Sequence, residues 1–369
     1  MSKNDAEGIM NKNKVLGKKL ACNFFKLSPF GGDTNRVKPP WAVSSPPTST
    51  MAIRQFKMHP KEDAYFSKKI FAFIILFAVI ISLNANAQLT KEPELLNASS
   101  NFNSKRFTTV VISETALASV VTIGLQYLWY KKYPKSKFHF FDDNDEWLQM
   151  DKMGHATTAY NISAVQYNLM RWSGVKRGTS EWVGGATGFA YLIMIEIMDG
   201  FSKEWGFSKG DMAADLFGSA FFTAQQALFN EQRIQMRFSF HKTIFAKYNP
   251  DELGANFPQR LIKDYNGQSY WFSFNIHSFL GQGNKFPRWI NADFGYGADG
   301  MTGAVTNPKE VHGNPIPTFD RNRKFFFGID GAFTKPGTIP FPSWINIFRI
   351  PTPVIELKEH KIKFRPFYF

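Results

Sequence analysis

The sequence predicts an α+β protein, in which a bundle of about four helices is followed by an antiparallel, aromatic-rich β-sheet or partial barrel. Apolar residues recur at the helical period over residues 107–229, whereas from Met236 onward they recur at every second position. Gly, Pro and Asn cluster between the alternating runs, as at Gly313-Asn314-Pro315. The change of period places the helical bundle before the sheet.

Four segments carry the helical pattern. The first, residues 108–130, is apolar apart from Glu114, and it is long enough to cross a bilayer. The alternative is the central helix of a soluble or peripheral bundle, because a signal peptide would already direct the protein to its compartment. The other three predicted helices are residues 151–172, 181–198 and 210–230.

The alternating pattern predicts about six strands in residues 233–369. In residues 270–276, Tyr270, Phe272 and Phe274 alternate with polar neighbours, so the sheet has one strongly aromatic face. That face packs against the helices, or it rests on a membrane. A strand ending in Phe369 resembles the last strand of outer-membrane barrel proteins, although six strands fall short of the roughly eight in the smallest barrels.

An export signal is predicted before the helices. Lys68-Lys69, the apolar run 70–83 and an Ala-x-Ala site ending at Ala87 have the order of a signal peptide. Residues 1–57 show no periodicity, and Met51 and Met58 are alternative starts, so no fold is expected there. The predicted organisation is a disordered or mis-annotated leader at 1–57, a signal peptide at 58–87, a helical domain at 88–232 and a β region at 233–369.

Charge and cysteine content narrow the function. Residues 1–87 hold 13 of the 44 basic and 5 of the 30 acidic residues, so the remainder carries 31 − 25 = +6 of the total +14. This mild charge has no basic stripe, which argues against a nucleic-acid partner. The single cysteine, Cys22, precedes the signal, so the mature chain is predicted to lack disulfides, thiol nucleophiles and cysteine metal sites.

Six ionisable residues stand at helical spacing among apolar neighbours. Buried carboxylates and imidazole are costly unless they are paired, hydrogen-bonded or bound to an ion, so they indicate a shared polar centre. Carboxylates with one imidazole suit zinc, manganese or non-haem iron, and they could equally act as acid and base. The alternative is a purely structural network, in which these groups satisfy one another's hydrogen bonds without a metal ion or a reaction. The predicted cluster is Asp151, His155, Glu196, Asp199, Asp211 and Asp215, and its candidate metal ligands are His155, Glu196, Asp199 and Asp211.

Two of these residues also have local explanations. Asp151 is placed to cap its helix, and Ser208 with Asp211 fits a capping box. Gly206-Phe207-Ser208-Lys209-Gly210 matches the pattern of a hydrolase nucleophile elbow, which needs a buried strand before the serine. Lys203-Glu204-Trp205 does not read as one, so the sequence predicts that Ser208 is a helix cap.

The same residues carry a family resemblance. Asp151-Lys152-x-Gly154-His155, Glu196-x-x-Asp199-Gly200, Trp205-Gly206-Phe207-Ser208 and Asp211-x-x-x-Asp215-x-x-Gly218 resemble the YfiM-like family, and more distantly VanZ-like membrane proteins. The first resemblance implies a periplasmic lipoprotein of unknown function, and the second implies membrane embedding. Neither implies a reaction. The missing lipid-acceptor cysteine departs from the lipoprotein pattern.

The sequence therefore predicts an exported, periplasmic envelope protein that is associated with the outer membrane, with the inner membrane as the alternative. Its partners are expected to be membrane lipid or another envelope protein. Its function is predicted to be structural or interactive, with the Asp/Glu/His cluster fixing the helices. The alternative is a metal-dependent hydrolase or transferase that acts on an envelope lipid or glycan, with a divalent metal as its cofactor.

Overall fold

A computed structural model describes residues 99, 101–128, 133–281, 283–331 and 346–369. These residues belong to one unit of the chain, Ala85–Phe369. The predicted leader and the predicted signal peptide lie outside the described residues. The prediction of a mixed fold, with helices followed by an antiparallel sheet, is confirmed.

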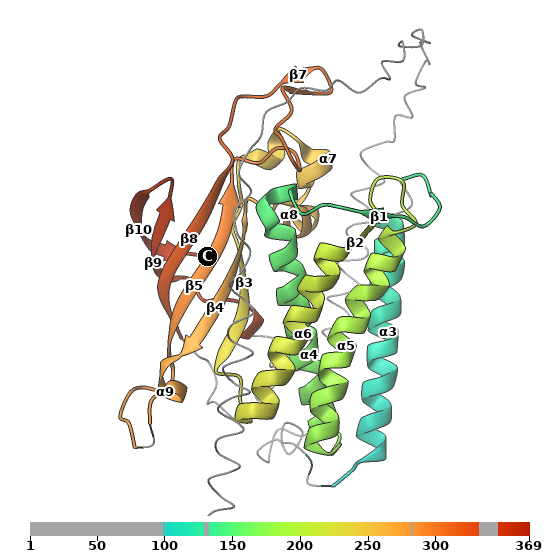
Figure 1. Cartoon of the computed structure of the whole chain (residues 1–369), viewed down its shortest axis with the longest axis vertical. Coiled ribbons are helices and arrows are strands. Elements are labelled where there is room, and N and C mark those ends of the chain that lie inside the picture. The colour runs from blue at the N-terminus through green and yellow to red at the C-terminus, as the bar shows by residue number, and fades with distance from the viewer. Residues whose placement is uncertain (1–98, 100, 129–132, 282, 332–345) are drawn as a thin grey trace, which may run out of the picture. The chain divides into compact units, whose positions relative to one another are not determined.

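The long helices follow one another in alternating direction and lie beside the sheet (Figure 1). Small residues let them approach closely, because a Cβ at Gly188 or Gly218 would collide with a backbone carbonyl of α4. The third predicted helix begins four residues early, where Arg177 pairs with Glu181 one turn later, at 2.6 Å. The helices are α3 (Ser104–Leu128), α4 (Met150–Trp172), α5 (Arg177–Asp199) and α6 (Lys209–Phe229).

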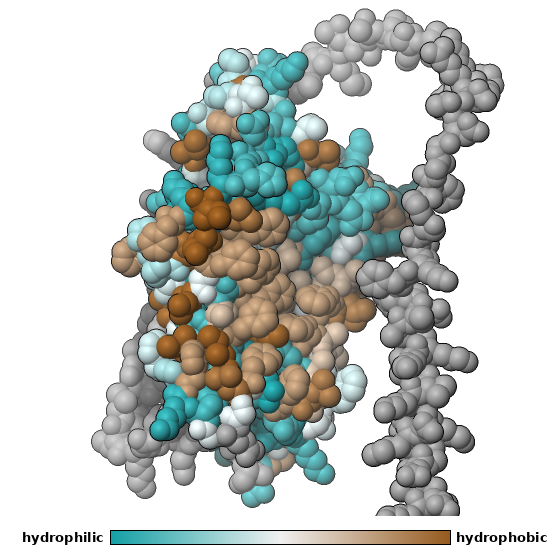
Figure 2. Space-filling model, turned by 60° about the vertical axis from the view of Figure 1, so that its left-hand side comes forward, coloured by the Kyte–Doolittle hydropathy of each residue, from teal (hydrophilic) through white to brown (hydrophobic). Residues whose placement is uncertain are grey.

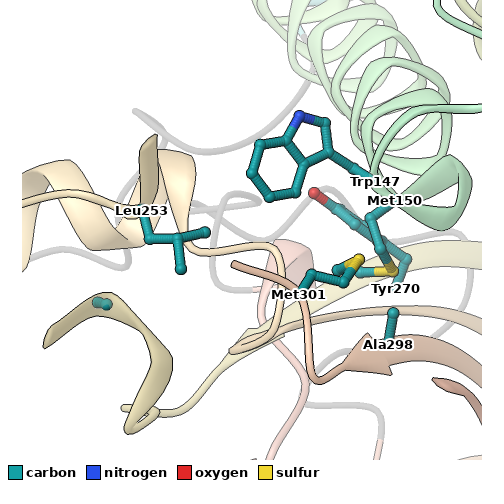
Figure 3. Close-up of a cluster of buried hydrophobic side chains, with 7 residues drawn as sticks. Trp147, Met150, Leu253, Tyr270, Ala298 and Met301 are labelled. Carbon is teal, nitrogen blue, oxygen red and sulfur yellow. The ribbon is translucent and has the colours of Figure 1, made fainter. Parts of the chain in front are cut away.

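A left-handed turn precedes α4. Trp147, Leu148 and Gln149 have φ values of 47°, 52° and 61°, a conformation that side chains other than glycine rarely adopt. Packing offsets the strain, since Trp147 is buried among apolar side chains of α4, the sheet and neighbouring loops (Figure 3). The Tyr296 hydroxyl also donates to the Leu148 carbonyl at 2.5 Å. The turn fixes where α4 starts.

Six antiparallel strands form the main sheet, in the order β10-β9-β8-β5-β4-β3. The sheet is open, with β3 and β10 at its edges, so it is not a closed barrel. The predicted strand 270–276 ends one residue early, because Asn275 caps the short helix α9 that begins at Ile276. The strands are β3 (Ile234–Phe240), β4 (Gln268–Asn275), β5 (Ile290–Asp299), β8 (Asn322–Gly331), β9 (Thr352–Lys358) and β10 (Lys361–Tyr368).

Short elements complete the described part of the chain. Two of them matter for the site, because β1 pairs in parallel with β2 directly before α6. They are β1 (Phe140–Phe141), η4 (Glu146–Gln149), β2 (Phe207–Ser208), η5 (Phe245–Lys247), α7 (Pro250–Leu253), α8 (Phe257–Lys263), α9 (Ile276–Phe279), β6 (Glu310–Val311) and β7 (Asn314–Pro315).

The sheet has an apolar face that is largely exposed and a polar face that is buried, the reverse of the usual arrangement in a soluble protein. Helices cover the aromatic face mainly at β3 and β4, where Tyr160 of α4 and Phe222 of α6 pack around Met236, and at one end of β5, where Ala298 is buried with Met150. Farther along, the register aligns Phe294, Phe327, Ile355 and Phe364 across four strands. The last three of these side chains are exposed.

The opposite face of the sheet buries charges. Arg237 pairs with Asp330, and Arg349 pairs with Asp293 at 2.9 Å. All four side chains are completely buried. The Arg349 guanidinium also stacks 4.0 Å from the ring centre of Trp271. The interior of the sheet is therefore polar, and much of its outer face is apolar.

Candidate functional site

Helices α4, α5 and α6 bring five of the six predicted polar residues together. Asp151 and His155 lie one turn apart near the start of α4, and Asp211 and Asp215 have the same spacing on α6. Glu196 lies in the last turn of α5. Because successive helices run in opposite directions, the start of α4, the end of α5 and the start of α6 meet at one end of the bundle.

His155 joins the three helices. Its Nδ1 lies 3.0 Å from Oδ1 of Asp215, and its Nε2 lies 3.7 Å from Oε1 of Glu196. The other oxygen of Glu196 accepts the backbone N–H of Ser208 at 3.0 Å. One imidazole and one carboxylate thus connect α4 to α6 through the end of α5.

Lys152 occupies the other side of the cluster. Its Nζ lies 2.7 Å from Asp143, 2.8 Å from Asp211 and 3.6 Å from Asp151. The hydroxyl of Tyr265, in the segment before β4, donates to Asp151 at 2.6 Å. The cluster therefore also ties the helices to the sheet region.

Ser208 is the N-cap of α6. Its hydroxyl accepts the backbone N–H of Asp211 at 3.0 Å and donates to Asp143 at 2.6 Å. The reciprocal bond of a capping box comes from Glu196 of α5 instead of from Asp211. The hydroxyl pairs with a carboxylate and a backbone amide, which is the geometry of a cap and not of a base-activated nucleophile. The residue before α4 in the capping position is Gln149, so Asp151 does not cap that helix.

Three residues converge closely enough to share an ion. One ligand atom each from Asp151, His155 and Asp211 lies within 4.8 Å of the others, and none of the three residues is exposed. Of the predicted metal ligands, Glu196 borders this triad through His155. Asp199 is the last residue of α5 and acts on Glu196 through its charge.

The electrostatics of the cluster reflect a surplus of acid. Burial alone would lower the pKa of His155, but its bond to Asp215 and the charges of Asp151 and Asp211 raise that pKa to about 10. Burial raises the pKa of Glu196 to about 7, with help from the charges of Asp199 and Asp215. A raised imidazole pKa means that the surroundings attract positive charge, whether a proton or a metal ion supplies it.

Lys152 shifts the balance on its own side. Burial and the charge of Asp151 raise the pKa of Asp211 to about 8, although Lys152 and His155 oppose the rise. Burial would also raise the pKa of Asp143, but hydrogen bonds from Asp211, Lys152 and Ser208 hold it below its usual value. Asp143 thus keeps its charge while Asp211 holds a proton readily.

The complete cluster is larger than the sequence indicated. Asp143, Lys152 and Tyr265 belong to it but were not predicted. Lys152 follows Asp151 directly, and the acidic connector before α4 could have identified Asp143. Tyr265 gave no signal, because its contact depends on how the sheet region packs. Five carboxylates (Asp143, Asp151, Glu196, Asp211 and Asp215) face two basic side chains (Lys152 and His155).

Comparison with known proteins gives one match. No curated protein and no solved structure matches the chain. Residues 139–227, which contain both basic side chains and all five carboxylates of the cluster, match the profile of a family described as "Predicted periplasmic lipoprotein (DUF2279)". The narrower YfiM-like assignment and the relation to VanZ-like proteins stay predictions. Over this segment, the chain is similar to a family of predicted periplasmic lipoproteins of unknown function.

Proposed function

We propose that this is an integral membrane protein of the cell envelope, with a structural or interaction role, whose polar cluster fixes the packing of its helices. Similarity to a periplasmic lipoprotein family supports an exported, periplasmic protein. The main observation that supports insertion in a membrane is an apolar belt on the surface. We define this belt as the exposed outer sides of α3, α5 and α6 together with the uncovered aromatic face of the sheet.

The helices contribute charge-free outer surfaces. Every exposed residue of α6 beyond Lys209 is Ala, Leu or Phe, and Leu228 is 73% exposed. From Trp182 onward, every exposed residue of α5 is also apolar. A helix on the surface of a soluble protein carries polar residues on its outer side. Beyond Arg177 and Lys209 at the two helix starts, the acidic residues Glu181, Glu196, Asp211 and Asp215 are buried instead, which suits a surrounding of lipid hydrocarbon.

Helix α3 adds a segment of membrane length. Within the described residues, only Ser104–Gln126 is long and apolar enough to span a bilayer. Just 6% of its most apolar stretch is buried, which favours a membrane-spanning helix over the core helix of a soluble bundle. We propose that α3 crosses the membrane and that α5 and α6 contact the same lipid.

The sheet extends the belt. Phe327, Ile329, Ile355, Ile362 and Phe364 all lie on one face and are exposed. Figure 2 shows apolar side chains gathered across the middle of the molecule, with hydrophilic residues toward both ends. A contiguous surface of this kind marks an interaction or membrane site. Apolar outward and polar inward faces are typical of outer-membrane strands, and for that reason we propose the outer membrane.

Cell fractionation tests this proposal. The full chain should remain in the membrane pellet after extraction with sodium carbonate at high pH, and it should sediment with outer-membrane markers. Recovery in the soluble periplasmic fraction would refute insertion in a membrane. Sedimentation with inner-membrane markers would support membrane insertion but show that the membrane is the inner one.

Matched variants locate the contact. Leu228→Lys and Phe364→Lys place charges in the belt and should shift protein from the pellet to the soluble fraction. The cost of a lysine is roughly 2–4 kcal/mol at the middle of the bilayer and falls toward its surface. His360→Lys adds the same charge in the turn between β9 and β10, outside the belt, and should have no effect. Equal behaviour of all three variants would contradict the assignment of the belt.

A further inference from the structure

We propose that Asp151, His155 and Asp211 bind one divalent transition-metal ion, and that Asp215 orients the imidazole. The three ligand atoms lie within 4.8 Å of one another, and ligands of one tetrahedral ion at roughly 2 Å lie about 3.4 Å apart. Side-chain adjustments on the order of 1 Å are therefore enough to close the site around an ion.

The position of Asp215 supports this assignment. A metal-binding histidine commonly gives its second ring N–H to a carboxylate, which fixes the tautomer and the ring plane. Oδ1 of Asp215 lies 3.0 Å from Nδ1 of His155, which leaves Nε2 as the ligand atom. Nε2 points to the side where Oε1 of Glu196 lies at 3.7 Å, so Glu196 borders the site.

Unsatisfied buried oxygen is the second, independent sign. Asp215 is completely buried, and among the described residues its Oδ2 has no hydrogen-bond donor. A carboxylate oxygen in that position costs free energy unless a cation or a proton is near. A divalent ion bound beside His155 supplies charge where the protein's own donors do not.

The ammonium group of Lys152 does not take the place of the metal ion. Nζ of Lys152 lies 2.7 Å from Asp143, 2.8 Å from Oδ1 of Asp211 and 3.6 Å from Oδ2 of Asp151. Asp211 can bind an ion through its second oxygen while Oδ1 keeps its contact with Lys152. Both oxygens of Asp151 have a neighbour, Tyr265 and Lys152, but each carboxylate oxygen carries two lone pairs and can accept an ion as well. With all groups ionised, five carboxylates against Lys152 and His155 leave an excess of three negative charges, which a divalent ion reduces.

The ligand types indicate which metal binds. Two carboxylates and one imidazole without thiolate favour Zn²⁺ or Mn²⁺ over softer ions such as Cu⁺. Three protein ligands leave at least one coordination position open. Calcium fits less well, because it takes six to eight oxygen ligands.

Calorimetric titration of the purified, chelator-treated full chain with Zn²⁺ or Mn²⁺ tests the proposal. We expect one saturable site per chain and a higher melting temperature when metal is bound, because only the folded chain assembles the ligands. Variants His155→Gln and Asp211→Asn should abolish saturable binding. Asp215→Asn should weaken it roughly 10–100-fold by releasing the imidazole.

An exposed histidine–aspartate pair provides the control. His312 and Asp251 lie 2.7 Å apart, far more exposed than the cluster, so His312→Gln should bind metal as the unchanged chain does. Circular dichroism shows whether each variant folds. If His155→Gln does not fold, Asp215→Asn and the melting temperature of the unchanged chain decide the matter. Absence of saturable binding by the folded chain, or binding that survives His155→Gln and Asp211→Asn, would overturn the proposal.

Discussion

The helical cluster and the interior of the sheet both bury charged groups, but they balance them differently. In the sheet, each buried aspartate has its own arginine, as in Arg237–Asp330 and Arg349–Asp293. In the helical cluster, five carboxylates share Lys152 and His155. A matched pair is balanced in charge within the protein, whereas an acid-rich cluster attracts protons or a cation from outside. The paired charges of the sheet therefore form a balanced structural unit, and the helical cluster is an acid-rich region that can take up protons or a cation.

The largest effect is expected from breaking a matched pair. Arg237→Ala leaves Asp330 buried without its partner and should lower the free energy of unfolding by roughly 3–5 kcal/mol. Chemical denaturation in detergent measures this loss. The double variant Arg237→Met with Asp330→Leu should recover most of it, since a buried pair can be replaced by apolar side chains. If the double variant is as unstable as the single one, the pair is not a self-contained unit.

Removing the ammonium group from the helical cluster should cost somewhat less. Lys152→Met leaves Asp143 and Asp211 without the cation that lies 2.7–2.8 Å from them, and about 3 kcal/mol of stability should be lost. The loss is limited because Asp211 can take up a proton, as its raised pKa of about 8 indicates. Thermal unfolding of Lys152→Met against Lys209→Met, an exposed lysine of α6, measures the difference. Equal melting temperatures would show that the cluster does not depend on Lys152.

The smallest of the three effects concerns pH and lies in the sheet region. Burial, together with the charges of Lys324 and Arg365, lowers the pKa of His241 to about 4, and its Nδ1 has no partner among the described residues. Between this value and the ordinary 6.5, the unfolded chain binds more protons than the folded one. Stability is therefore full above pH 6.5 and falls as the pH is lowered toward 4, by about 2 kcal/mol at pH 5.

His241→Asn should remove this part of the pH dependence. Denaturation curves at pH 7 and pH 5 for the variant and the unchanged chain isolate the contribution. His360→Asn, at an exposed turn, serves as the control and should leave the dependence unchanged. If the slope of stability against pH persists in His241→Asn, the buried imidazole is not its source.

Local sequence patterns predicted the elements of this fold well, because each helix and strand buries one periodic set of side chains. The helical spacing of Asp151 with His155, and of Asp211 with Asp215, placed these residues correctly on α4 and α6. Lys152 was harder to predict, since lysine on a helix is usually solvated and becomes a partner only when three acids surround it. Tyr265 and the left-handed turn at Trp147 depend on tertiary packing, for which the local sequence carries no signal.

The uncovered sheet face could not be predicted from the alternation alone. Phe272 and Phe327 follow the same pattern, yet Phe272 packs against the helices whereas Phe327 is 49% exposed. Coverage depends on how many strands α4 and α6 reach, which is a property of the assembled layers. The sequence left packing on helices and resting on a membrane as alternatives, and the structure divides the sheet between a covered part and an uncovered part.

The open edge of the sheet at β10 limits how deeply the protein could insert in the proposed membrane. Backbone amides and carbonyls on the outer side of β10 pair with no neighbouring strand in the described part of the chain, and in hydrocarbon each would lose its hydration at a cost of several kcal/mol. Lys361, Lys363 and Arg365 stand at alternate positions of this strand, and Arg365 pairs with Glu356 at 2.8 Å. In the proposed membrane, β10 would therefore lie at the boundary between hydrocarbon and water, and the protein would be tilted in the bilayer.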